Sequence, residues 1–131
     1  DMLESLKVAL CSQRHNACMP NVGWCEVTDM LFRNNAKMAE RTGFPTLGVL
    51  KPGAAADVIV MDYKPFTPFS DANIDGHMLF GMTGRQCQTT MINGKILMKD
   101  RVLTEIDEEA VNARILESSK RLWGRLNHRE Y

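Results

Sequence analysis

The sequence of 131 residues predicts an α+β fold, with helices toward both ends of the chain and a short antiparallel sheet between them. Apolar residues recur at helical spacing over residues 1–18 and again from about Glu26 or Thr28 to Arg41. Asn93-Gly94 separates two β-prone runs, which is the strongest short-range signal for a hairpin. A further helical pattern follows Asp107. Together these patterns predict a small sheet that is accompanied by helices.

The first expected helix spans residues 1 to about 18 and has one broad apolar face. Asp1 can cap this helix or lie in its first turn, where a carboxylate interacts favourably with the helix dipole. Pro20 and Gly23 then end it. The residues expected on the buried face are Met2, Leu3, Leu6, Ala9, Leu10 and Ala17.

The second expected helix ends at Gly43, which suits the left-handed residue that follows a helix C-terminus. The helix-forming pattern is continuous, although two asparagines near its centre lower the helix propensity. The stripe expected at helical spacing consists of Val27, Met30, Leu31, Asn34, Met38 and Ala39.

Residues 48–62 predict a tight turn followed by a buried strand. The turn Lys51-Pro52-Gly53-Ala54 suits type II, since Pro presets φ and Gly accepts a positive φ. The run Val58–Met61 is apolar and β-branched, and Asp57 and Asp62 bound it. Such a run is typical of a strand that is covered on both faces.

Two prolines and three aromatic residues follow in Tyr63–Ser70, which is expected to be an extended loop over its own domain. A peptide-recognition segment is the alternative for this loop. The apolar segment Ile74–Met82 predicts one or two helical turns packed against the sheet. It contains His77, for which we expect a half-buried side chain bonded to backbone and not a metal ligand, since no second ligand stands at metal-binding spacing.

The hairpin strands are expected at Gln86–Ile92 and Lys95–Met98, because a type I′ turn needs a positive φ at both central residues. Residues 99–101 then turn the chain into a short strand at 102–104. The last helix is expected from about Glu108 to Leu126, capped by Asp107, with Ile106 and Val111 as a hydrophobic staple. Its end, residues 128–131, is expected to fray. The stripe expected to be buried consists of Val111, Ile115, Leu122 and Leu126, with Trp123 at its edge.

Sixteen basic and sixteen acidic residues cancel, and neither sign forms runs, which argues against nucleic acid or an anionic membrane as the main partner. No apolar run approaches the roughly 18–20 residues that span a bilayer, and no signal-peptide pattern is present. The four cysteines lack a Cys-x-x-Cys pair and are expected to be reduced, buried or semi-buried thiols in a cytoplasmic protein. They are Cys11, Cys18, Cys25 and Cys87. The chain begins without a start Met, in what reads as a helix onset, as if it were cut from a longer protein.

A catalytic site needs convergent groups, such as a nucleophile with a base, paired carboxylates or clustered metal ligands. The sequence has three isolated histidines and none of the common hydrolase, metalloprotease or nucleotide-binding motifs. We therefore expect no catalytic, cofactor-binding or metal-binding residue within these 131 residues, and no catalysis by them alone.

One phrase resembles a known family. A helix ending at Ala39–Gly43, then Gly48-x-Leu50-x-Pro52-Gly53-x-x-Ala56-Asp57, four apolar residues and Asp62, resembles the C-terminal segment of metal-dependent amidohydrolases. The pair His77-Met78 and the hairpin Thr90–Lys95 extend the resemblance over nearly the whole chain. Within that superfamily the sequence is most similar to SsnA-type aminohydrolases and chlorohydrolases.

The resemblance implies a fold and an activity for a longer parent protein. Residues 1–47 would be the terminal helices of a (β/α)8 barrel, and residues 48–131 the C-terminal part of a small β-sandwich with its closing helix. The parent would use a divalent metal, zinc or iron, to hydrolyse non-peptide carbon–nitrogen bonds, as in deaminases. The family's metal ligands belong upstream, and Asp1 falls too late in the pattern to be one of them.

Two interpretations remain open. In the first, the chain is the C-terminal fragment of such an aminohydrolase, and its partner is the N-terminal barrel of its own parent. Strand edges left open in the isolated fragment would then favour a homo-oligomer. In the second, the chain is a stand-alone α+β module that binds a partner through the hairpin ribbon or the Tyr63–Phe69 loop.

Overall fold

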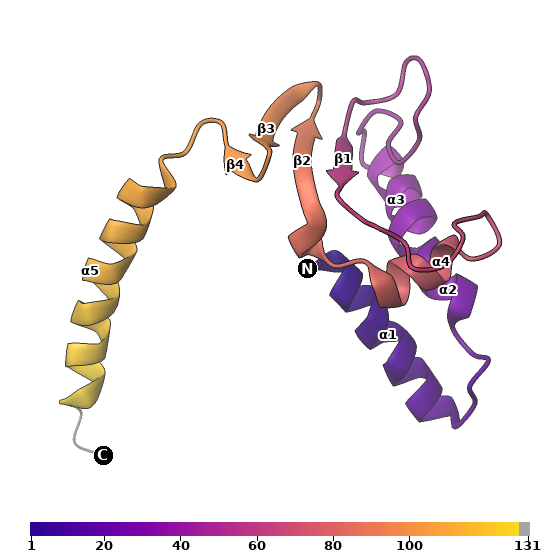
Figure 1. Cartoon of the computed structure of the whole chain (residues 1–131), viewed down its shortest axis with the longest axis horizontal. Helices are drawn as coiled ribbons and strands as arrows, with labels where there is room; N and C mark the ends of the chain where they lie inside the picture. The colour runs from indigo at the N-terminus through magenta and orange to yellow at the C-terminus, as the bar shows by residue number, and fades with distance from the viewer. Residues whose placement is uncertain (129–131) are drawn as a thin grey trace.

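A computed structural model describes residues 1–128 as an α+β chain with helices at both ends and an antiparallel sheet between them (Figure 1). Fraying is expected for residues 128–131, of which residues 129–131 lie outside the described residues. The elements are α1 (Met2–Ala17), α2 (Trp24–Asp29), the π-helix η1 (Met30–Asn34), α3 (Asn35–Arg41), β1 (Val58–Met61), α4 (Ile74–Gly76), the π-helix η2 (His77–Gly81), the 3-10 helix η3 (Gly84–Gln86), β2 (Cys87–Ile92), β3 (Lys95–Lys99), β4 (Val102–Leu103) and α5 (Glu108–Asn127).

A small core joins α1, α2 and η2. Leu6, Leu10, Val27 and Leu79 are its buried apolar residues, and Leu3, Ala9 and Leu31 pack against them. The expected apolar face of α1 is thus confirmed at its centre. The predicted burial is wrong for Met2 and Ala17, which are exposed in the described chain. In the stripe expected for the second helix, Met30, Asn34 and Met38 are exposed as well.

The second expected helix is present but is not a uniform α-helix. It begins at Trp24, a little earlier than predicted, and changes to a π-helix over Met30–Asn34 before it returns to α-helix. A π-turn within an α-helix adds one residue to the turn and rotates the face that follows. Gly43, at φ 89°, takes the left-handed conformation predicted for the residue that ends the helix.

The sheet has the order β1-β2-β3-β4, and all neighbouring strands are antiparallel. Its hairpin turn is confirmed, because Asn93 and Gly94 have φ values of 48° and 78°. Asp57 Oδ1 accepts a hydrogen bond of 2.6 Å from the Asn93 amide, which ties the turn to the start of β1. The predicted turn before β1 is also confirmed, with Gly53 at φ 87° and a hydrogen bond from Ala54 N to Lys51 O.

The segment that contains η2 packs on the helices and not on the sheet, contrary to the prediction. Leu79 is fully buried in the core beside Leu6 and Leu10 of α1. Asp1 supports this packing: its Oδ1 accepts from Leu3 N and Glu4 N at the start of α1, and its Oδ2 accepts from Gly84 N at 2.7 Å. The predicted cap is therefore confirmed, and the same carboxylate also anchors the segment that precedes β2.

Helix α5 stands apart from the helical core (Figure 1). Asp107 caps it by accepting from Ala110 N at 3.0 Å, as predicted. The predicted burial of its apolar stripe is wrong for the described chain, since α5 has no buried residue. Among residues 1–128, none of the helices combines the length and the apolar character that crossing a bilayer requires.

Candidate functional site

His77 is the only histidine buried in the described chain, with 6% of its surface exposed. Its Nδ1 lies 2.5 Å from the Tyr63 hydroxyl, and its Nε2 lies 3.1 Å from Thr67 Oγ1. The rings of Phe66 and Phe69 lie 6.1 and 5.1 Å from the His77 ring, centroid to centroid. His77 is therefore more deeply buried than expected, and its partners are side-chain hydroxyls where backbone was predicted.

This cluster fastens the extended segment after β1 onto η2. A Cβ atom added to Gly81 would overlap the Tyr63 hydroxyl, so the close approach of the ring requires a glycine there. An open pocket of about 190 Å³ adjoins the cluster; it is lined by Phe66, Thr67, Asn73, Gly76, His77 and Phe80. With both ring nitrogens of His77 engaged by hydroxyls, the arrangement suits a structural clasp better than a proton-transfer site.

The remaining metal-ligand side chains are dispersed. Among residues 1–128, no three His, Cys, Asp or Glu side chains lie close enough together to hold a metal ion, so the described residues do not fit a metal centre. His15 lies exposed in the last turn of α1. The cysteines are free thiols, but the expectation that they are buried is wrong for Cys11, Cys18 and Cys25, which are exposed.

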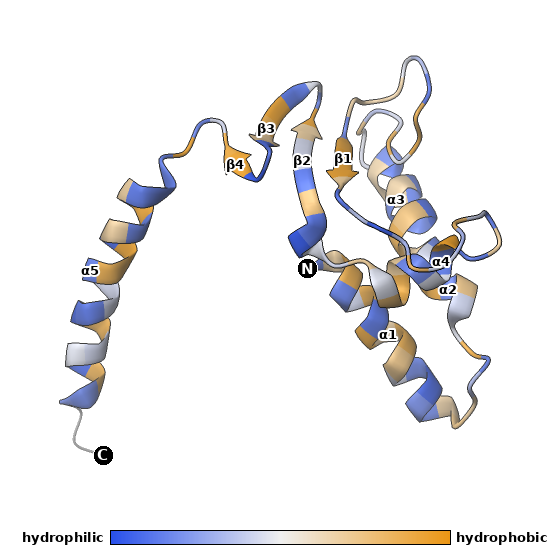
Figure 2. Ribbon diagram, viewed as in Figure 1, coloured by the Kyte–Doolittle hydropathy of each residue, from blue (hydrophilic) through white to orange (hydrophobic). Residues whose placement is uncertain are grey.

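The most prominent feature of the described chain is its uncovered apolar surface. Only four large apolar side chains form the buried core, while 24 are exposed. Scattered exposed apolar residues are ordinary on a monomer, but continuous apolar faces mark surfaces that another chain or segment covers. Figure 2 shows apolar positions on β1, on β4 and along α5.

Strand β1 is uncovered on both faces. Ile59 is 58% exposed and Val60 is 47% exposed, and adjacent residues of a strand point to opposite faces. The predicted coverage of this strand on both faces is therefore not provided by the described chain. Because β1 pairs only with β2, its other edge carries unpaired backbone groups. Both faces and one edge of β1 are thus open to further packing in the described chain.

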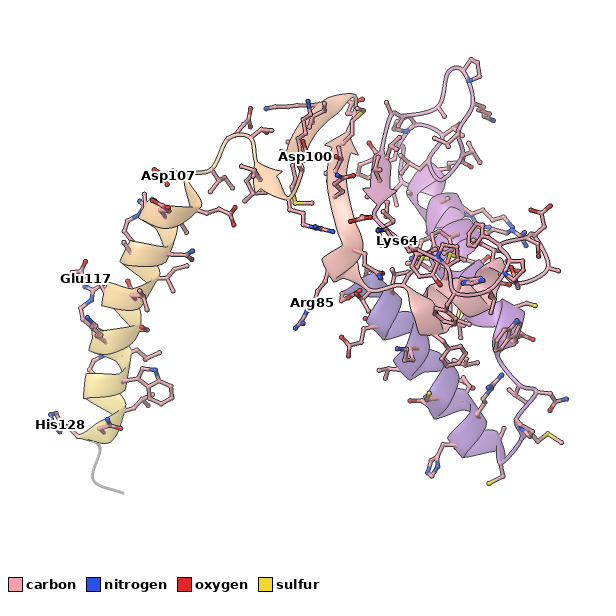
Figure 3. The ribbon with its side chains drawn as sticks, viewed as in Figure 1. Lys64, Arg85, Asp100, Asp107, Glu117 and His128 are labelled. Carbon is pink, nitrogen blue, oxygen red and sulfur yellow. The ribbon has the colours of Figure 1, made fainter. Side chains whose placement is uncertain are left out.

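Helix α5 has a similar uncovered face. The stripe that we predicted to be buried is present at helical spacing, but its side chains are exposed: Ile115 is 56%, Leu122 46% and Leu126 37% exposed. Glu117 lies on the side of α5 turned away from the sheet (Figure 3). This face and the two faces of β1 are the candidate functional surfaces of the described chain.

The comparison with known proteins shows which proteins the chain resembles. Over 97% of its length the chain is 30% identical to a 5'-deoxyadenosine deaminase of Methanosarcina mazei and also to one of Methanosarcina barkeri. Over 72% of its length it is 35% identical to a 5-methylthioadenosine/S-adenosylhomocysteine deaminase of Halothermothrix orenii. No family model matches the chain. The chain belongs to the amidohydrolase superfamily.

The match with these amidohydrolases is nearly complete for the chain but partial for the relatives. The chain spans only 29% of the length of the two Methanosarcina deaminases and 22% of the Halothermothrix enzyme. These relatives do not test the finer resemblance to SsnA-type enzymes and chlorohydrolases, which belong to the same superfamily.

The Tyr63–His77–Thr67 cluster is the part of the structure that the sequence reasoning missed. Tyr63 and Thr67 lie 14 and 10 residues from His77, in a loop whose path no periodicity encodes. The available signal was indirect. Gly81 ends a short apolar helical segment, where a glycine lowers helix stability, so its presence indicates that another group approaches the backbone closely there.

Proposed function

We propose that this chain is the C-terminal segment of a metal-dependent aminohydrolase that deaminates an adenosine derivative. The observation that carries the proposal is the alignment: 97% of the chain matches a 5'-deoxyadenosine deaminase, but covers only 29% of it. Hydrolytic deamination of such a nucleoside replaces the exocyclic amino group of adenine with oxygen from water and releases ammonia.

In this proposal the chain has an architectural role in a longer protein, here called the parent enzyme. Residues 1–47 supply the last helices of a (β/α)8 barrel, and residues 48–131 complete a small β-sandwich and its closing helix. The bare faces and edge of β1 and the exposed face of α5 support this assignment, because each is a surface that further strands or helices would cover.

The catalytic groups and the divalent metal, zinc or iron, belong to the upstream part of the parent enzyme. We propose that residues 1–131 contribute no catalytic, cofactor-binding or metal-binding residue, and that the isolated chain is inactive. Its partner is the N-terminal barrel of the same polypeptide, in a cytoplasmic enzyme without a role for nucleic acid or membrane. Unpaired edges would favour homo-oligomers when the segment is produced alone.

The test is ammonia release by the purified parent enzyme from 5'-deoxyadenosine, 5'-methylthioadenosine and S-adenosylhomocysteine. Activity on at least one of these nucleosides is the expected result. Metal should co-purify with the protein, and chelation should abolish turnover until zinc or iron is restored. An intact, metal-loaded parent that releases no ammonia from any adenosine derivative would overturn the proposal.

The alternative, a stand-alone interaction module, has one observation in its favour: Phe66 is 80% and Phe69 52% exposed on the loop that the alternative would use for binding. The two proposals differ in the size that they predict for the natural polypeptide, and the stand-alone module would have a mass of 14.8 kDa.

A further inference from the structure

Helix α5 needs a partner surface. The α5 face, as we name it, consists of the stripe Val111, Ile115, Leu122 and Leu126 together with Leu116 and Trp123, which widen it on one side. A helix of this kind gains most of its stability from packing its apolar face, and not from intrinsic propensity. Leu116 and Trp123 are 62% and 61% exposed, so the described chain does not provide that packing.

The two borders of the α5 face differ. At 100° per residue, Arg114, Arg121 and Arg125 fall in a row along the border opposite Leu116 and Trp123. Arg121 donates to Ser118 Oγ at 3.3 Å. Within the described chain, none of the three guanidinium groups forms an ion pair with a carboxylate. The surface that covers this face is therefore expected to bring carboxylates to its arginine border.

A second copy of α5 meets this requirement poorly. In an antiparallel two-fold pair of helices, equivalent borders face each other, so the arginine row of one helix would meet the arginine row of the other. In a parallel pair, the arginine row would face Leu116 and Trp123. In this projection Glu109 lies beside Leu116, so a parallel pair would offer the three arginines one carboxylate, and Glu117 lies one turn before Arg121 on the outer side of the arginine row.

We propose that the α5 face docks on the catalytic part of the parent enzyme, against an apolar patch bordered by carboxylates that pair with Arg114, Arg121 and Arg125. This inference rests on the proposed function. The deaminase relatives extend far beyond the 29% of their length that the chain covers, which leaves ample polypeptide to provide the surface. Only residues 104–107 join β4 to α5, so the first turns of α5 lie close to the sheet.

A photo-cross-linking residue in the parent enzyme tests the proposal. With p-benzoylphenylalanine in place of Ser119, a polar and half-buried residue within the α5 face, irradiation is expected to join α5 to a peptide upstream of residue 1. The cross-linked protein keeps the mass of one chain. The control position is Glu117, which is exposed on nearly the opposite side of the helix from Ser119 and should give no upstream cross-link.

Charge reversal tests the arginine border. Replacing Arg114, Arg121 and Arg125 together by Glu should lower the Ser119 cross-link yield severalfold, whereas Lys120→Glu should leave it unchanged. Cross-links to a second copy, cross-links only within residues 1–131, or no cross-link at Ser119 would each overturn the inference. Ammonia release is measured on the same samples: a deaminating parent without an upstream cross-link refutes the docking alone, and an inactive parent refutes the proposed function.

Discussion

The Tyr63 hydroxyl lies 2.5 Å from Nδ1 of His77, and this contact fastens the chain after β1 onto the helical core. Thr67 engages the other ring nitrogen of His77 at 3.1 Å, so one buried side chain holds two points of the same loop. Asp62 continues the attachment from the sheet side, because its carboxylate accepts from Arg101 at 3.2 Å. The loop between β1 and α4 is thus positioned by specific polar contacts over a small apolar core.

Gly81→Ala should destabilise the parent enzyme by about 1–3 kcal/mol, the usual cost of overpacking, because its Cβ would overlap the Tyr63 hydroxyl. Tyr63→Phe in the same chain removes the hydroxyl and should recover part of this loss. The matched control is Gly124→Ala, which meets nothing within 4 Å in α5 and should be stabilising by ~0.5–1 kcal/mol. Urea denaturation measures all three; equal effects of the two glycine substitutions would contradict the packing described here.

Asp1→Ala should cost more stability than Asp107→Ala, although each removes a helix N-cap. Loss of a cap costs about 1 kcal/mol. Asp107 accepts only within its own helix, whereas Asp1 also accepts from Gly84 N, which lies 83 residues away. Amide hydrogen exchange in the parent enzyme provides the readout: Asp1→Ala should speed exchange at Gly84 as well as at Leu3. Unchanged exchange at Gly84 would show that the long-range bond contributes nothing.

Asn93→Val should destabilise the hairpin by about 1–2 kcal/mol, since a β-branched residue is strained at a positive φ. Asn93→Gly should change the free energy of unfolding little, because glycine accepts this conformation and keeps the amide that donates to Asp57. Thermal unfolding of both variants is the measurement. If the two substitutions cost the same, the turn does not require positive φ at this position.

Val60→Lys should have little effect on the stability of the isolated chain and a large effect on that of the parent enzyme. In the isolated chain Val60 is 47% exposed, and a charge there should change stability by less than about 0.5 kcal/mol. In the parent, where we propose that further layers cover β1, the same substitution should cost several kcal/mol by burying an unpaired charge.

Leu50→Lys is the control for that comparison, because Leu50 is 88% exposed and lies outside the sheet. Thermal melting of each variant in each form of the protein gives the result. A Val60→Lys substitution that is harmless in the parent would show that β1 stays uncovered there.

The sequence predicted what depends on local chemistry. The Asn93-Gly94 turn, the Asp1 and Asp107 caps and the left-handed Gly43 follow from the conformations that few neighbouring residues allow, and all are confirmed. The prediction that Ile59, Val60 and the α5 stripe are buried is wrong for the described chain. Apolar periodicity indicates which face of a helix or strand tends to be buried, but not whether other parts of the same 131 residues pack against that face.

The same distinction applies to the candidate site. Neither the bond between Tyr63 and His77 nor the link from Asp1 to Gly84 could be predicted, because each joins segments whose separation in space depends on loop paths. The absence of catalytic motifs was visible in the sequence, whereas the extent of the exposed apolar surface became visible only when the fold showed how few apolar residues are covered.

The most direct test of the central claim is the intact denatured mass of the protein isolated from its natural source. Our account predicts a single polypeptide several times larger than 14.8 kDa that contains these residues near its C-terminus. A polypeptide of 14.8 kDa would contradict it, since the bare faces of β1 and α5 would then have to be covered by a separate partner.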